Sequence, residues 1–412
     1  MRKVRKWLWL DVLALLVVIS GVVGAALLLS AGDRGEKPTP FPTAAMTAEP
    51  TPTATPTGRP TATDWGDWPT YGYDNARTRY APNVKLRPPF KLRWRFDAHD
   101  LLEFPPSIDE GRLYINAGHG YVYCLDARNG KRLWRYAAHG KFASTPAVDK
   151  DEVYVTTFAG RMICLDKVTG HRKWAFRDSG PSESSPLVWR GRIFFGDRNG
   201  MIWALSAKHR KVVWRYRCDG RINGAPAQLG DRIVVGTYGG TVYCLSYDGR
   251  LYWKRSTSGA VGVTDPFYAT AALAYNTVYI GSTGRHVFAF DLSNGGTRWK
   301  ATVGAWVYSS AAVWRGLVLL GCYDTYFYAF NAASGRVAWR FNAGAKISGS
   351  ATVLNGVVYF ATIKRHHTWA LDARSGRKLW DWPDGAYTPV TADRKQIYLC
   401  GVHKLYCLVP KK

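Results

Sequence analysis

Short hydrophobic runs separated by turn residues follow one another along most of the chain, and helical periodicity is hard to find after residue 63. The runs recur in a unit of about forty residues, which is typical of a β-propeller built from four-stranded blades. Each unit closes with a Leu or Phe, an acidic or small polar residue, a short turn, a basic residue and a tryptophan. Eight tryptophans at spacings of 40, 40, 40, 39, 46, 40 and 41 residues mark the units: Trp94, Trp134, Trp174, Trp214, Trp253, Trp299, Trp339 and Trp380.

The pattern predicts an all-β, eight-bladed β-propeller over residues 64–412. The last repeat reaches Leu408 but has no tryptophan after it, and Trp94 has no repeat strand before it. We therefore expect the strand near residues 91–96 to be the outer strand of the eighth blade. Such a closure joins the two ends of the domain and removes an open sheet edge.

Two recurring positions in the repeat are interpreted as structural. The turns that begin at Asp126, Asp166 and Asp372 each end in glycine, so that the acid caps backbone amides and the glycine accepts a positive φ. Four of the seven cysteines, Cys124, Cys164, Cys244 and Cys407, share one position, which the other four repeats fill with alanine. This alternation predicts a small buried side chain, and no CxxC pair indicates a zinc site.

The N-terminal residues differ in composition from the repeats. Residues 1–32 hold a basic flank and an uncharged apolar run from Val12 to Ala31, which predicts a single transmembrane signal anchor with a cytoplasmic N-terminus. A cleaved signal peptide is the alternative, and both interpretations export the propeller. Residues 33–63 are rich in Pro, Thr and Ala, as expected of a disordered stalk.

The chain is strongly basic, with 56 Lys and Arg against 30 Asp and Glu. Residues 1–63 carry seven basic and four acidic side chains, which leaves a net charge of +23 on the rest. Part of this charge is periodic, because seven of the eight tryptophans have a basic residue or histidine three positions earlier. These are Lys91, Lys131, His171, Lys211, Arg250, Arg336 and Arg377. The pattern favours anionic envelope polymers or a lipid surface as partners, and nucleic acid is not expected outside the cell.

The complete repeats Leu125–Trp134 and Leu371–Trp380 resemble the tryptophan-docking motif of the pyrroloquinoline quinone (PQQ)-like β-propellers. The segment of residues 67–80 is similar to the lead-in of that superfamily. Its members include PQQ-dependent quinoprotein dehydrogenases and non-enzymatic BamB-like propellers. The resemblance implies that the eight tryptophans dock neighbouring blades by stacking between them.

The chain departs from the dehydrogenases of this superfamily in two respects. They typically carry adjacent cysteines against the cofactor, and they hold Ca²⁺ through Glu and Asn near a catalytic Asp on longer loops; this chain has no adjacent cysteines, and its repeats have almost no insertions. We therefore expect a monomeric, non-catalytic scaffold at the membrane that binds protein or anionic partners, with no catalytic residue and no cofactor. The alternatives are a PQQ- and Ca²⁺-dependent alcohol or sugar dehydrogenase, or an extracellular ligand sensor.

Loops that lead into the innermost strands should gather on one face of the propeller. Aromatic, cationic and acidic side chains occur together there, a composition that suits a planar anionic ligand or a partner segment. The predicted binding residues are Glu103, Phe142, Glu183, Arg221, Asn223, Asp265, Trp306, Tyr308, Lys346 and Tyr387. The adjacent His366 and His367 should point to opposite faces of a strand, so no metal site is predicted.

Overall fold

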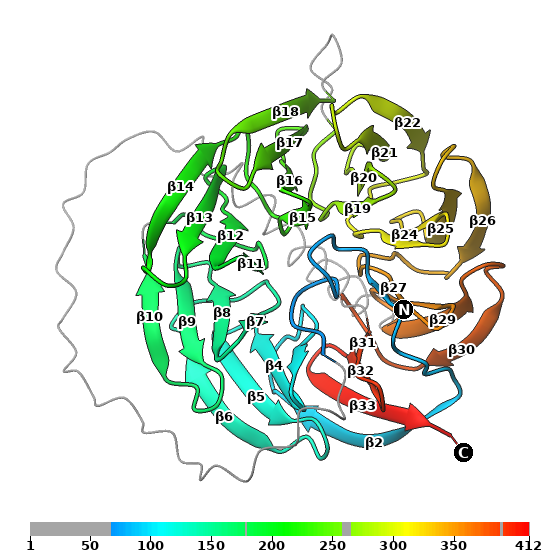
Figure 1. The fold of residues 1–412 in the computed structure, drawn as a ribbon. Helices are drawn as coiled ribbons and strands as arrows, with labels where there is room; N and C mark the ends of the chain where they lie inside the picture. Colours follow the sequence, from blue (N-terminus) through cyan, green and yellow to red (C-terminus); the bar gives the residue numbers. More distant parts are fainter. Residues whose placement is uncertain (1–66, 178, 258–264, 388–389, 412) are drawn as a thin grey trace, which may run out of the picture. The chain divides into compact units, whose positions relative to one another are not determined.

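The computed structural model describes residues 67–177, 179–257, 265–387 and 390–411. Their regular elements are all strands, which form eight sheets around a central channel (Figure 1). The predicted eight-bladed propeller is therefore confirmed. No stretch of these residues forms a helix of the length and hydropathy that crossing a bilayer requires. The expected anchor (1–32) and stalk (33–63) lie outside the described residues.

The four strands of each blade follow one another from the channel to the rim. In the first four blades they are β3 (Ser107–Asp109), β4 (Arg112–Ala117), β5 (Tyr121–Asp126), β6 (Arg132–Ala137); β7 (Ala147–Asp149), β8 (Glu152–Thr156), β9 (Met162–Asp166), β10 (Arg172–Phe176); β11 (Leu187–Trp189), β12 (Arg192–Gly196), β13 (Met201–Ser206), β14 (Lys211–Arg217); β15 (Ala227–Leu229), β16 (Arg232–Gly236), β17 (Thr241–Ser246) and β18 (Leu251–Ser256). In the last four they are β19 (Ala272–Ala274), β20 (Thr277–Gly281), β21 (His286–Asp291), β22 (Thr297–Thr302); β23 (Ala312–Trp314), β24 (Leu317–Gly321), β25 (Tyr326–Asn331), β26 (Val337–Asn342); β27 (Thr352–Leu354), β28 (Val357–Thr362), β29 (His367–Asp372), β30 (Lys378–Trp382); β31 (Thr391–Ala392), β32 (Ile397–Cys400), β33 (Lys404–Pro410) and β2 (Phe90–Asp97).

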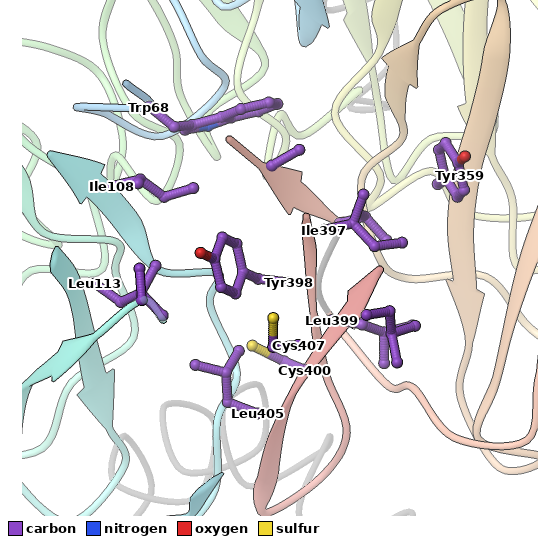
Figure 2. Packing of buried hydrophobic residues seen from close by; sticks show 14 of the residues in the cluster. Trp68, Ile108, Leu113, Tyr359, Ile397, Tyr398, Leu399, Cys400, Leu405 and Cys407 are labelled. Carbon is purple, nitrogen blue, oxygen red and sulfur yellow. The ribbon is translucent and has the colours of Figure 1, made fainter. Parts of the chain in front are cut away.

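The ring closes as the sequence predicts. Strand β2 pairs antiparallel with the C-terminal strand β33, from Phe90 opposite Pro410 to Asp97 opposite Lys404. In Figure 1 the two strands lie side by side near the C-terminus. Figure 2 shows the packing at this joint, where Tyr398 and Cys407 of the last blade share a buried cluster with Leu113 of the first.

A bulge precedes the tryptophan in every outer strand and turns its ring toward the next blade. Across the strand pair each tryptophan faces the small Cys or Ala position of its own blade; Trp134 lies opposite Cys124, and Trp299 lies opposite Ala289. The small side chain leaves room for the indole. All seven cysteines are buried and free, and the four at this repeat position are therefore small buried side chains, as predicted.

Six of the eight tryptophans, all except Trp174 and Trp380, dock onto the turn of the following blade. The indole Nε1 of Trp299 donates to the carbonyl of Ala332 at 2.8 Å, and the ring lies against the turn glycine, Gly335. The turn acids cap their own backbone, as predicted; Asp126, for example, accepts from the amide of Arg128 at 2.7 Å. Glycine is therefore required at this turn for two reasons: the backbone has a positive φ of 70°, and a Cβ would collide with the indole ring.

Two docking sites depart from this arrangement. Trp380 has no turn to dock onto, because β33 and β2 of the following blade come from the two ends of the domain, and its ring lies 5.5 Å from that of Phe90. The other site involves the third blade. The turn of the third blade has Arg210 where most of the others have glycine, and Arg210 keeps the positive φ at 57°. The tryptophan that should dock there is Trp174, and its indole nitrogen is buried without a hydrogen-bond partner among the described residues. The junction between the second and third blades therefore lacks the hydrogen bond that Trp299 makes.

Residues 67–81, here called the plug, cross the channel and contact the innermost strands of seven blades. Trp68 exchanges two backbone hydrogen bonds of 2.8 Å with Ile108. Further along, plug carbonyls accept from the amides of Val148, Gln228, Leu273, Val313 and Val353 at 2.7–2.9 Å. The buried Arg77 reaches the third and fourth blades through the carbonyls of Pro186 and Pro226. Strand β1 (Tyr80–Ala81) ends the plug by pairing with β27. In Figure 1 this blue segment occupies the middle of the ring.

Candidate functional site

Eight equivalent positions surround the channel on the face opposite the plug. Each lies four residues before the first residue of an innermost strand, so each blade contributes one residue. In blade order these are Glu103, Ala143, Glu183, Asn223, Tyr268, Tyr308, Ser348 and Tyr387. The residue just before each is apolar in most blades and is held by a backbone bond to a hairpin of the preceding blade; Phe267, for example, donates to Thr237 O and Val307 to Ser282 O. Rigid strands therefore fix the ring positions.

Six titratable side chains gather at this mouth: Glu103, Glu183, Tyr268, Tyr308, Tyr323 and Tyr387. We call them the tyrosine–carboxylate ring. Tyr268 donates from its hydroxyl to Glu183 Oε2 at 2.8 Å, and its aromatic ring lies 5.1 Å from that of Tyr308. The Tyr308 ring in turn lies 4.9 Å from that of Tyr323, which belongs to a hairpin. Tyr387 and Glu103 lie near enough to Tyr323 and Glu183 for their charges to influence one another.

The centre of the ring is enclosed and electronegative. Burial, reinforced by the negative charge of Glu183, raises the pKa of Glu103 to about 7. Burial raises the pKa of Tyr268 well above its usual value, and the charge of Glu183 adds to the shift. Burial also raises the pKa of Tyr308, Tyr323 and Tyr387. The tyrosines therefore remain neutral, and the carboxylates supply the negative charge of the mouth.

Cations and one tryptophan surround this acidic centre. Arg198 Nε lies 3.7 Å from Glu183 Oε1. The guanidinium of Arg221 stacks over Tyr238 at 3.8 Å, and Lys346 Nζ lies 5.3 Å from the centroid of the Tyr323 ring. Trp306 is 51% exposed and lies 6.2 Å from both Tyr308 and Tyr323. The mouth is thus acidic at the centre and basic at the rim.

Replacement of Glu103 by Gln should stabilise the protein only at higher pH. The folded pKa of about 7 exceeds the ordinary value of 4.5, so the folded state holds the proton more tightly and its stability falls as pH rises from about 4.5 to about 7. The shift corresponds to about 3 kcal/mol that the neutral Gln avoids. We expect thermal melts at pH 8 to show a higher Tm for Glu103→Gln than for the wild type, with little difference at pH 4. An equal difference at both pH values would contradict the assignment.

The structure brings most of the predicted binding residues to the mouth, but not all. Glu103, Glu183, Asn223, Tyr308 and Tyr387 occupy ring positions, and Arg221, Trp306 and Lys346 lie at the rim.

Two predicted residues lie elsewhere. Phe142 is buried in a cluster between the first and second blades, because its position is the apolar one that precedes the ring position. Asp265 is 4% exposed; its Oδ1 accepts from Ser282 and His286 at 2.8 and 2.7 Å, and Lys300 lies 3.6 Å from Oδ2. Asp265 fastens a hairpin of the fifth blade.

Tyr268 and Tyr323 belong to the tyrosine–carboxylate ring but are absent from the predicted binding residues. Tyr268 could have been found by counting back four residues from each innermost strand, because that register places it beside Tyr308. Tyr323 had no such signal. It follows a buried cysteine in a hairpin whose counterparts in other blades hold unrelated side chains, such as Arg198 and Thr283.

Comparison with known proteins identifies the family. A family model described as outer membrane protein assembly factor BamB matches residues 91–188, 180–311 and 307–401, which together span most of the chain. The chain belongs to the PQQ-like β-propeller family. The resemblance drawn from the repeat motif is therefore confirmed.

Proteins similar to this PQQ-like propeller include dehydrogenases and a BamB protein. The 1-butanol dehydrogenase (cytochrome c) of Thauera butanivorans is 38% identical over 74 residues, which are 16% of this chain and 11% of that protein. Among solved structures, BamB from Moraxella catarrhalis has a TM-score of 0.66 at 16% identity and covers 78% of this chain and 100% of its own. A europium-containing methanol dehydrogenase has a TM-score of 0.74 at 12% identity, with 84% and 98% covered. The similarity to these solved structures shows the fold alone. The matches to curated dehydrogenases span only about a tenth of the length of those proteins.

The mouth of this PQQ-like propeller meets only part of what a PQQ and Ca²⁺ centre requires. Glu183 and Asn223 are neighbours in the ring, and carboxylate and amide oxygens are suitable Ca²⁺ ligands. None of the eight ring positions is an aspartate, however, and Asp265 is engaged within its own blade. Among the described residues no group of three or more His, Cys, Asp or Glu side chains is placed to hold a metal ion. The residues therefore do not fit the catalytic centre that the enzyme resemblance implies.

Proposed function

We propose that this chain is a non-catalytic, extracytoplasmic propeller that acts as a binding or assembly scaffold, with the mouth as its working face. One observation carries the proposal: none of the eight ring positions is an aspartate, and Tyr268 at one of them donates its hydroxyl to Glu183. A general base must reach the proton that it removes, and neither a neutral tyrosine nor the engaged Asp265 meets that need. Tyrosine and tryptophan at a concave mouth are instead typical of binding surfaces.

The outer wall of the propeller supports anionic envelope partners as a second class of ligand. The residue after the tryptophan is an exposed cation in six of the eight outer strands: Arg95, Arg135, Arg215, Lys254, Lys300 and Arg340. These cations keep the exposed strand edges soluble and also surround the molecule with positive charge. Attachment to the membrane through residues 1–32 would place this wall near anionic lipids or polymers.

Incubation of the protein with PQQ and Ca²⁺ should give no oxidation of alcohols or sugars in a dye-linked assay. The reason is the absence of an aspartate from the ring and of adjacent cysteines from the chain. The 1-butanol dehydrogenase relative would serve as the positive control. Turnover that depends on PQQ and disappears in the Glu183→Gln variant would overturn the proposal and establish the dehydrogenase alternative.

A further inference from the structure

We propose that the tyrosine–carboxylate ring binds the cationic side chain of a lysine or arginine in a partner polypeptide. This inference rests on the proposed function as a scaffold and names the chemistry of its partner. The ring offers aromatic groups and carboxylates around one axis, which is the combination that recognises an organic cation.

The aromatic part of the ring is preassembled. Tyr268 and Tyr308 meet edge to face at 76°, and Tyr308 and Tyr323 lie closer still, at 4.9 Å between centroids. Tyrosines held against one another in this way lose little further side-chain freedom when a ligand binds, which reduces the entropic cost of association. A cation that enters among aromatic rings is attracted by the electron-rich face of each suitable ring.

The polar part of the ring lacks a counter-charge of its own at the centre. Glu103 and Glu183 are close enough for the charge of one to oppose ionisation of the other. Arg198 contacts Glu183 only at 3.7 Å, from the rim side. Asn223, 7% exposed, occupies the ring position next to Glu183, and its Oδ1 is buried without a hydrogen-bond partner among the described residues. An ammonium or guanidinium group supplies the positive charge that the carboxylates lack. It also supplies a hydrogen-bond donor for Asn223 Oδ1.

The rim favours a polypeptide over a free amine. Arg221 and Lys346 lie around the acidic centre, so they repel a ligand that carries several positive charges. They attract a ligand in which one positive charge is flanked by carboxylates. Trp306 is 51% exposed and offers an apolar contact beside the ring. A lysine or arginine flanked by acidic residues matches this arrangement of acidic centre, basic rim and exposed tryptophan.

The test uses the full chain in detergent and two fluorescent peptides, measured by anisotropy at pH 8. One peptide carries a single lysine between glutamates in a glycine–serine background, and the other replaces the lysine by uncharged norleucine. We expect the lysine peptide to bind at least about tenfold more tightly, because a charge-assisted contact typically contributes 1.5 kcal/mol or more. Equal affinities would overturn the inference.

Variants separate the two parts of the ring. Glu183→Gln keeps the acceptor for Tyr268 and should weaken binding of the lysine peptide about tenfold, with an unchanged melting profile as the check on folding. Tyr308→Ala should weaken binding, whereas Tyr308→Phe, which retains the ring, should not. Affinity unchanged in Glu183→Gln would refute the role of the carboxylates.

Competition with butylamine and with Ca²⁺ distinguishes a cationic side chain of a polypeptide from a free amine or a metal ion. Failure of butylamine to displace the peptide at equal concentration supports a polypeptide ligand, whereas displacement at equal concentration by either competitor overturns it. A negative result with both peptides leaves the PQQ assay as an independent test of the scaffold function, so the two proposals can fail separately.

Discussion

A chain that lacks residues 1–96 is expected not to accumulate as a folded monomer, whereas a chain that lacks only residues 1–63 should fold and remain soluble. The longer deletion removes β2 and exposes the edge of β33 along the whole register from Lys404 to Pro410. It also removes the plug, with the buried Trp68 and Arg77. An unpaired apolar edge is a template for aggregation, so the loss should appear in both yield and oligomeric state.

An intermediate deletion through residue 81 isolates the plug from the closing strand. This chain keeps β2 but loses the backbone bonds to the innermost strands, and we expect its Tm to fall by about 10 °C or more, because several kcal/mol of contacts are lost. Size-exclusion chromatography and thermal melts of the three truncations provide the measurement. Equal stability of the chains that begin at residues 64 and 82 would show that the plug contributes nothing to the fold.

Gly335→Ala should be among the most destabilising single methyl additions in the protein. A Cβ at this position would lie 2.7 Å from the ring of Trp299, and the backbone has φ of +70°. Overpacking and the positive φ together should cost about 3 kcal/mol in the free energy of unfolding. Chemical denaturation with urea measures the change.

Two matched variants test the cause. Gly316 has φ of +78° but nothing within 4 Å of its would-be Cβ, so Gly316→Ala should cost only about 1 kcal/mol. Arg210→Gly restores the usual turn residue next to Trp174 and should stabilise by about 1 kcal/mol. Similar losses for Gly335→Ala and Gly316→Ala would mean that backbone conformation, and not the docked indole, determines the cost.

The sequence predicted the blades well because their determinants are local and repeated. The tryptophan, its bulge and its small cross-strand partner recur in all eight blades, and the turn glycine recurs in six of them, so the same local packing is repeated around the ring. The closure by β2 could be predicted for a related reason, since the first and last repeats are each incomplete in complementary ways. The plug could not, because its residues do not repeat and most of its partners are backbone amides, from six blades, which leave no side-chain pattern.

The repeat also determines which parts of the site could be predicted. Loops that lead to the channel could be located from the repeat, and most of the named side chains do reach the mouth. Asp265 was misplaced by the prediction because a carboxylate near a channel invites a chemical interpretation, while the hydroxyl and imidazole that engage it come from a hairpin about twenty residues away. Phe142 was misplaced because successive side chains of an extended segment point in opposite directions. A shift of one residue therefore moves a side chain from the channel to the core.

The beginning of the plug gives the molecule a front and a back. Asp67 Oδ1 accepts the amide of Glu110 at 3.3 Å, and Glu110 belongs to a hairpin on the face opposite the mouth. The chain therefore enters the ring from behind. A force transmitted through the segment before residue 67 is therefore applied on the face opposite the tyrosine-lined mouth. Tension along that segment reaches the innermost strands of several blades through the plug, so the load is distributed around the ring and does not fall on one sheet.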